Sequence, residues 1–463
     1  MRLNTFLAGL LATSAASCGG QGTSKGGSQS PATSDDGAAT DDGSSSDDGA
    51  PSTGQNATAK KDGGAAVNRP GKDGGAPTKD GAAPTSTGGN PVTTRNDAGP
   101  ASPAGTDDPE TSKPDAGTPP ASSDDKPQLA VSADFLNQTL TVFNVDKMVE
   151  GASRKDVLVG KVDLSKYSPG PVALNVTPDG KTALVSISPS FLDAFVTIPP
   201  GDGILLFVDL TTLTVVGELN TGVKPMGIII TQDGKHAFVG QLSDTYISYV
   251  DIEKRTFEKL QTGAQWNEEL AMDDTGTVGI VSYGTGGDAK TFSIANPKMM
   301  GQTTGLSGDA GGTAFFPGTK IAYLVQAPTD LTFNVGGHNV VDVTNPTMPV
   351  VSDNIRIQAP KMYPCTAVKS RKTVVYPSFE NNMAYLTEMK LEGTVAKEAQ
   401  KLPIGPAGNL PYGVSSTPDN RVLIAVPGDH YIGVVDLETK KAFQVPWEQT
   451  KSGPNDIKMI PKN

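Results

Sequence analysis

Large hydrophobic side chains are missing from the first part of the chain. Between Gly19 and Pro127 there is no Phe, Trp, Tyr, Leu, Ile or Met, and Val67 and Val92 are the only large aliphatic residues. Small and polar residues fill this stretch, together with 16 acidic and 9 basic residues, so its net charge is 9 − 16 = −7. Such a segment cannot bury enough apolar area to offset its chain entropy. We predict that residues 18–127 are a disordered low-complexity tether.

Cysteine and histidine are scarce, which leaves little for redox or metal chemistry. Cys18 and Cys365 are the two cysteines, one in the leader and one far downstream, so a disulfide within the chain is not expected. His236, His338 and His430 lack the close spacing of metal ligands. We therefore predict no metal and no cofactor. We interpret the histidines as surface residues and Cys365 as a small core residue.

Motifs of covalent and phosphate chemistry are also absent. The sequence has no haem-attachment motif, nucleophile elbow, phosphate-binding loop or dinucleotide fingerprint, and we predict no catalytic residues from it. Glu268 and Glu269 could supply an acid and a base, but neighbouring strand residues face opposite sides, so only one could enter a common site. The preferred interpretation is that both are solvated surface carboxylates.

The charge balance of the remaining chain argues against nucleic acid as a partner. After Pro127 there are 34 acidic and 28 basic residues, a net charge of 28 − 34 = −6, without long runs of one sign. Binding to phosphate backbones requires clustered positive charge. We expect no nucleic-acid partner, and we expect a monomer.

The N-terminus has the order of a secretory signal. Arg2 precedes an apolar run, residues 6–12, and small residues then lead to a cysteine. The sequence Ala15-Ala16-Ser17-Cys18-Gly19 resembles a bacterial lipobox, although Ala15 stands where Leu is usual. The resemblance implies that residues 1–17 are a signal peptide, that Cys18 carries lipid, and that the protein is a cell-envelope lipoprotein at the outer membrane or cell surface. Cleavage at a plain Ala-x-Ala site is the alternative.

A lipid anchor would give the tether a role. A folded domain held by acyl chains needs a solvated spacer to clear the headgroups. The 109 residues from Gly19 to Pro127 would supply that spacer. A flexible chain of this length spans about 55–60 Å on average.

One phrase recurs along the second part of the chain. Its clearest copy begins at Pro225 and has a β-branched run from Ile228 to Ile230, the turn Asp233-Gly234, and a second run from Ala237. An Asp-Gly pair between such runs is typical of a β-hairpin. Further copies have their turns at residues 180, 276, 318, 371, 420 and about 463.

The spacing of these turns predicts the fold. Intervals of 54, 42, 42, 53, 49 and 43 residues bracket the four-strand unit of a propeller blade. The last copy provides only an inner strand, and residues 129–145 offer the missing outer strands. We therefore predict an all-β fold, a seven-bladed β-propeller over residues 128–463, in which both chain ends complete one blade and remove the open edges.

The repeat also resembles a known family. The phrases Val-Asp-Leu-Thr-Thr-Leu-Thr-Val-Val, Pro-x-Gly-Ile, Gln-Asp-Gly-Lys and Ala-Phe-Val look like the YVTN-type repeat, a WD40-like propeller unit. This resemblance covers residues 128–463 and implies an extracytoplasmic propeller. Proteins of this kind include binding scaffolds, surface-layer proteins and lactone hydrolases, so the fold alone does not decide the function.

A ligand would meet the mouth of the ring, where each inner strand begins. The polar and aromatic residues next to these starts are the candidate ligand face: Lys224, Trp266, Asn267, Tyr363, Tyr412 and Asn455. Packing between blades is the alternative role for the aromatic members.

Three functions remain open from sequence. The first is a non-catalytic binding or scaffolding module for an envelope protein, a polysaccharide or a small ligand. The second is a hydrolase resembling lactonases, which requires carboxylate, His or Arg side chains to converge in the channel. The third is a purely structural spacer at the cell surface.

Overall fold

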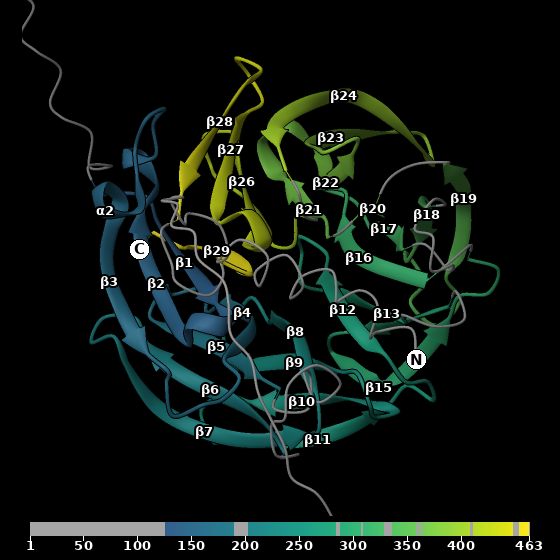
Figure 1. Cartoon of the computed structure of the whole chain (residues 1–463). Helices are drawn as coiled ribbons and strands as arrows, with labels where there is room; N and C mark the ends of the chain where they lie inside the picture. The colour runs from purple at the N-terminus through teal and green to yellow at the C-terminus, as the bar shows by residue number, and fades with distance from the viewer. Residues whose placement is uncertain are drawn as a thin grey trace, which may run out of the picture. The chain divides into compact units, whose positions relative to one another are not determined.

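Seven sheets, arranged in a ring, make up the fold (Figure 1). The structure, a computed structural model, describes residues 126–188, 202–283, 288–306, 309–327, 336–357, 361–362, 364–407, 411–447 and 453–462. The signal peptide, Cys18 and nearly all of the predicted tether lie outside the described residues. The prediction of a seven-bladed β-propeller is confirmed.

Each sheet is one blade, and blades 1 to 7 are numbered from the one that contains β1. The innermost strands, from blade 1 to blade 7, are β29 (Asp456–Ile460), β4 (Pro171–Val176), β8 (Pro225–Ile230), β12 (Asn267–Met272), β16 (Asp309–Phe315), β21 (Thr366–Val368) and β25 (Val414–Ser416). The second strands are β1 (Leu129–Asp134), β5 (Thr182–Ile187), β9 (His236–Gln241), β13 (Val278–Tyr283), β17 (Ile321–Ala327), β22 (Thr373–Glu380) and β26 (Arg421–Val426).

The outer half of each blade continues the antiparallel order. The third strands are β2 (Thr139–Asn144), β6 (Gly203–Asp209), β10 (Tyr246–Asp251), β14 (Ala289–Ser293), β18 (Gly336–Asp342), β23 (Met383–Glu392) and β27 (Tyr431–Asp436). The rim strands are β3 (Leu158–Asp163), β7 (Thr214–Gly222), β11 (Thr256–Gln261), β15 (Asn296–Gln302), β19 (Val350–Ile357), β24 (Val395–Pro406) and β28 (Lys441–Pro446). A short strand, β20 (Lys361–Met362), also pairs with β22.

Helix is minor in the part of the chain that the structure describes. The helical segments are η1 (Phe135–Asn137), η2 (Val145–Lys147), α2 (Arg154–Val157), η4 (Lys369–Arg371) and η5 (Pro427–Asp429). Within the described ranges, none of them has the length and apolar character to cross a membrane.

The core is divided among the junctions between neighbouring blades. Seven clusters of buried apolar side chains occur, one at each junction of the ring. Alternate residues of one strand supply opposite clusters: Val131 of β1 packs toward blade 2, and Ala130 packs toward blade 7. A blade is therefore covered on both faces, which explains why the middle strands read as continuous apolar runs.

The predicted turns adopt the conformations that their residues favour. Gly180 and Gly234 have φ of +68° and +69°, and Asn420 takes the same role with φ +67°. Glycine and asparagine tolerate this left-handed region better than other residues. In blade 3 the Thr231 hydroxyl donates to Asp233 Oδ1 at 2.7 Å and accepts from the His236 N–H at 3.0 Å, which fixes the hairpin.

These turns also join consecutive blades. Gln232 of blade 3 donates a hydrogen bond to the backbone carbonyl of Asp274 in blade 4. The Asp274 carboxylate then accepts from the Gly318 N–H of blade 5 at 2.8 Å. Arg421 of blade 7 donates to the Val145 carbonyl of blade 1 at 3.0 Å. The turn face of the ring is therefore cross-linked by polar contacts as well as by packing.

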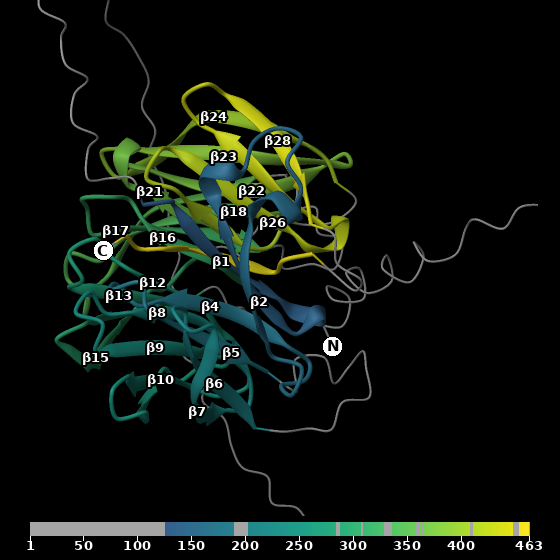
Figure 2. The same cartoon turned by 90° about the vertical axis from the view of Figure 1, so that its left-hand side faces the viewer.

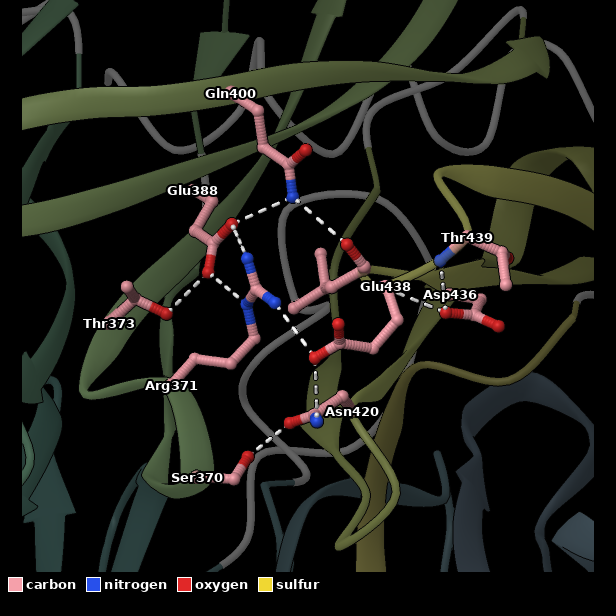
Figure 3. Close-up of polar contacts among 10 residues, drawn as sticks. Ser370, Arg371, Thr373, Glu388, Gln400, Asn420, Asp436, Glu438 and Thr439 are labelled. Carbon is pink, nitrogen blue, oxygen red and sulfur yellow. Dashed lines mark hydrogen bonds and ion pairs between the residues drawn. The ribbon is translucent and has the colours of Figure 1, made fainter. Parts of the chain in front are cut away.

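A buried ion pair within blade 6 also contacts blade 7 (Figure 3). Glu388 is 1% exposed and accepts from Arg371 at 2.7 and 3.2 Å, from Thr373 at 2.7 Å and from Gln400 at 2.7 Å. Arg371 also reaches Glu438 of blade 7 at 2.9 Å. Burial alone would raise the pKa of Glu388, but the hydrogen bonds from Arg371 and Thr373 outweigh it and hold the pKa below its usual value.

The two chain ends complete blade 1, as the sequence predicts. The C-terminal strand β29 pairs antiparallel with β1, with Leu129 opposite Ile460 and Ala133 opposite Asp456. Figure 2 shows β1 and β2 between the strands of blade 7 and those of blade 2. Because β29 is held between β1 and the channel, the ring has no unpaired blade edge at its closure.

Candidate functional site: the central channel

The seven inner strands surround one cavity of about 370 Å³. Every blade contributes to its wall, from β4 in blade 2 round to β29 in blade 1. Polar and apolar atoms share the wall about equally, and Met226, Ile228, Met272 and Phe315 are among the apolar residues that line it. A few ionisable groups interrupt it, and they come from strands that are far apart in sequence.

An acid and a base on β29 form one polar feature of the cavity. Asp456 accepts hydrogen bonds from the backbone N–H groups of Leu174 and Ile457 at 3.0 and 2.9 Å. The Lys458 ammonium lies 2.9 Å from the same carboxylate. Burial would lower the pKa of Lys458, but Asp456 and, more weakly, Glu269 raise it above its ordinary value. The Asp456–Lys458 pair is thus close to neutral as a unit.

Glu269 of β12 is the second carboxylate in the cavity, and it has no such partner. Within the described ranges we find no hydrogen bond to its side chain, which lies over Gly227 of the neighbouring blade. Burial raises the pKa of Glu269 to about 8, and nearby Asp456 adds to the rise while Lys458 opposes it. The carboxyl group is therefore poised to change charge close to neutral pH.

Further polar residues line the same wall, among them Tyr412 and Thr313. Tyr412 precedes β25, and its pKa is raised by burial and by the carboxylates of Glu268, Glu269 and Asp456. Thr313 of β16 is 6% exposed, and its buried hydroxyl oxygen has no hydrogen-bond partner among the described residues.

Cys365 precedes β21 and contributes a thiol to the cavity. Burial and the Glu269 charge raise the thiol pKa well above its ordinary value, so it is a neutral group here. It packs against the core cluster between blades 5 and 6, yet it is only half-buried. The prediction of a small buried core residue is therefore correct only in part.

The sequence holds a signal for the two carboxylates that the motif search did not use. In the inner-strand phrase Pro-x-Gly or Pro-x-Ala, the third residue is Ala173, Gly227 or Gly413. Aligned on the hairpin turns, the same position holds Glu269 in blade 4 and Asp456 in blade 1. The interpretation of Glu269 as a solvated surface carboxylate is wrong, whereas Glu268 is not part of the cavity wall.

Some of the six residues predicted for a ligand face line the cavity in the structure, and others lie elsewhere. Tyr412 lines the cavity, but Lys224, Trp266, Asn267 and Asn455 do not. The Asn267 side chain donates to the Asp244 and Ala264 carbonyls at 3.0 and 2.9 Å. The Asn455 side chain donates to the Val172 carbonyl at 2.7 Å. Both amides hold the chain between blades.

The remaining two aromatic predictions differ in outcome. Trp266 is half-buried, with φ +66° and its backbone N–H bonded to the Leu242 carbonyl at 2.8 Å. Tyr363 lies outside the described residues.

The histidines lie away from the channel. His236 stacks on Tyr249 at 4.9 Å between ring centres, and His430 is the left-handed residue after η5. The prediction that all three are surface residues is wrong for His338, which is 2% exposed in blade 5. Burial lowers the pKa of His338, and Asp353, 3.8 Å away, partly opposes this. Among the described residues, no cluster of three or more His, Cys, Asp or Glu could hold a metal ion.

Comparison with known proteins supports the architecture. A protein described as functionally unknown, from Desulfotomaculum acetoxidans, is 11% identical with a TM-score of 0.54, over 73% of this chain and 100% of that chain. The hydrazine synthase of Kuenenia stuttgartiensis is 19% identical with a TM-score of 0.48, over 58% of this chain and 77% of that chain. No protein-family model and no curated protein sequence matches the chain. At 11% identity the likeness to the Desulfotomaculum acetoxidans protein concerns the fold alone, and the chain is a seven-bladed β-propeller.

Proposed function

We propose that this chain is a cell-envelope lipoprotein with a YVTN-type propeller, which acts as a non-catalytic binding module for a small polar ligand in its central channel. The lipobox-like sequence before Cys18 supports attachment to the outer membrane or cell surface, and the polar tether supports an extended position away from it. The observation that carries the binding role is the cavity of about 370 Å³, which contains one carboxylate without a hydrogen bond from the described residues.

The composition of the cavity favours ligand binding. Small-molecule sites are concave, mostly apolar, and carry a few converging polar groups. The cavity combines apolar residues with polar groups that converge from blades 1, 4, 5, 6 and 7, among them Lys458, Asp456, Glu269, Thr313, Cys365 and Tyr412. A purely structural spacer gives no reason for unmatched polar groups in the middle of the ring.

Hydrolysis of the lactonase type has less support. No His or Arg is among the described residues that line the cavity, and the Asp456 carboxylate is occupied by two backbone N–H groups and Lys458. Asp274 also lines the cavity, but it accepts from the Gly318 N–H at 2.8 Å and lies 3.9 Å from Lys369. Among the cavity carboxylates of the described residues, Glu269 is then the one available to a ligand. A single acid can bind a polar group, but it lacks the second positioned group that acid–base hydrolysis uses.

Filling the channel should abolish ligand binding without unfolding the ring. Ala173 is half-buried and lines the cavity, so Ala173→Phe would occupy the space of a ligand. We expect at least one member of a panel of small amines, carboxylates, alcohols and sugars to raise the melting temperature of the full chain by about 5 °C at high excess. Ala173→Phe should remove that shift.

The matched control introduces the same phenylalanine side chain outside the cavity. Val216 on the rim strand β7 is 43% exposed, and Val216→Phe should leave the ligand-induced shift intact. Calorimetry of all three proteins checks the result. If no probe shifts the melting temperature, or if Ala173→Phe responds like the native chain, the channel is not the binding site.

The lipid anchor is tested at its cysteine. Labelled palmitate should be incorporated into the native chain expressed in bacteria, and Cys18→Ala should lose the label and leave the membrane fraction. Cys365→Ala is the matched control and should keep both the label and the membrane location. Incorporation that survives in Cys18→Ala would refute the anchor.

A further inference from the structure

We propose that the ligand of the central channel is a small organic cation, a protonated primary amine with a short apolar body, whose ammonium group pairs with the Glu269 carboxylate. This inference rests on the proposed function, because it assumes that the channel is the binding site. It names the chemical class of the ligand and the residue that selects it.

The charge balance of the cavity points to a cation. Asp456 and Lys458 neutralise each other at 2.9 Å, so neither presents a free charge to a ligand. Glu269, once ionised, is a negative group without a hydrogen-bond donor from the described residues. A carboxylate removed from water is unfavourable unless a positive or hydrogen-bonding partner compensates it. A cationic ligand would supply that partner.

The number and kind of polar atoms suit an ammonium group. An ammonium donates three hydrogen bonds and accepts none. Glu269 offers carboxylate oxygens, and Thr313 on the same wall has a buried hydroxyl without a hydrogen-bond partner among the described residues. The Tyr412 side chain lies close enough to Glu269 for the two groups to interact electrostatically. These residues lie on blades 4, 5 and 7, so polar groups line the cavity from three blades.

The rest of the wall suits a short alkyl body. Met226 and Ile228 of β8, Met272 of β12 and Phe315 of β16 line the cavity beside the polar groups. A volume of about 370 Å³ lies at the lower end of small-molecule sites. The ligand is thus small, with its charge at one end and apolar surface at the other.

Binding should be coupled to the loss of a proton. The pKa of Glu269 is about 8, so its carboxyl is mostly protonated at pH 7 and mostly ionised at pH 9. The charged and titratable groups that face it are Lys458 and Asp456 of β29, Tyr412 of blade 7, and the Cys365 thiol of blade 6. A primary amine, with a pKa near that of lysine at about 10.4, stays charged over this range.

The experiment uses butylammonium as the probe, with butan-1-ol and butyrate as neutral and anionic analogues of the same length. Titration calorimetry on the full chain should give a butylammonium Kd that falls about tenfold between pH 7 and pH 9, since the ionised fraction of Glu269 rises about tenfold. At pH 7, two buffers of different ionisation enthalpy should reveal the release of nearly one proton per ligand.

Two neighbouring glutamates provide the variant and its control. Glu269→Gln should weaken butylammonium binding at least about tenfold and remove both the pH dependence and the proton release. Glu268→Gln, one residue away and not part of the cavity wall, should retain all three properties. Cooperative melting of both variants would show that the ring is folded.

The outcomes separate this inference from the proposed function. Butylammonium binding that is absent, independent of pH, or unchanged in Glu269→Gln would overturn the proposal that the ligand is an amine. If butanol or butyrate then binds and Ala173→Phe abolishes that binding, the channel remains a binding site for another class of ligand. If no probe of any charge binds, the proposed function and this inference are both overturned.

Discussion

Removing residues 453–463 should abolish cooperative folding of the propeller. This deletion takes away β29, whose five residues pair with β1 and whose Ile457 is fully buried between blades 1 and 7. Each lost hydrogen bond is worth about 1 kcal/mol and the buried side chain about 2–3 kcal/mol. The total is comparable with the whole stability of a domain, about 5–15 kcal/mol. Circular dichroism during thermal unfolding would show no sharp transition.

A shorter deletion is the control for this result. Removing residues 461–463 leaves all of β29 in place and should preserve the transition. If the chain that lacks residues 453–463 still unfolds cooperatively at a similar temperature, the ring does not depend on closure by both ends.

Breaking the ion pair between Arg371 and Glu388 should be the most damaging single substitution among the charged residues described. Arg371→Met would leave Glu388, 1% exposed, as a buried carboxylate without its cation (Figure 3). Removing one partner of a buried pair destabilises by about 3–5 kcal/mol. Urea unfolding at pH 7 should show a loss of this size.

The pH dependence of this loss has a fixed sign. In the native chain folding lowers the pKa of Glu388. The ionised carboxylate therefore stabilises the fold fully above the pKa that Glu388 has in the unfolded chain, and this stabilisation is lost as the pH falls through its pKa in the folded chain. In Arg371→Met the carboxyl can be protonated in the folded state, and the difference from the native chain should shrink toward pH 4.

An exposed ion pair between two blades is the matched control. Lys298 of β15 lies 2.8 Å from Glu258 of β11, and the two side chains are 69% and 60% exposed. Exposed pairs contribute about 0–1 kcal/mol, so Lys298→Met should change the stability little. Equal effects of Arg371→Met and Lys298→Met would contradict the role assigned to the buried pair.

The architecture was predictable because its signals are local and repeated. Asp233-Gly234 and its counterparts at Gly180 and Asn420 set the hairpin turns, and each is followed by a strand apolar enough to be covered on both faces. The closure of the ring could be predicted by counting the strands in each repeat, because the last copy lacks the outer strands that residues 129–145 supply.

The channel was only partly predictable because its polar groups converge from different blades. Tyr412 could be found from its place beside the start of an inner strand. Glu269 and Asp456 are more than 180 residues apart, and nothing local distinguishes either from a surface acid. Their shared position in the repeat becomes informative only when the neighbouring copies, with Gly227 and Gly413, show that this place lies against the next inner strand.

The pair between Arg371 and Glu388 had no sequence signal at all. Arg371 ends the short helix η4, Glu388 lies 17 residues further on in β23, and their burial depends on how blade 7 covers blade 6. Contacts of this kind follow from the packing of whole blades, which a repeat pattern does not specify.

Closure by β29 supports both the ring and the channel, because this strand seals blade 1 and also supplies Asp456 and Lys458. Amide hydrogen exchange of the full chain, measured on peptides that cover residues 453–462, tests this closure most directly. The account predicts that these amides are protected for as long as those of β26, despite their place at the end of the chain. Exchange within seconds, with β26 still protected, would contradict it.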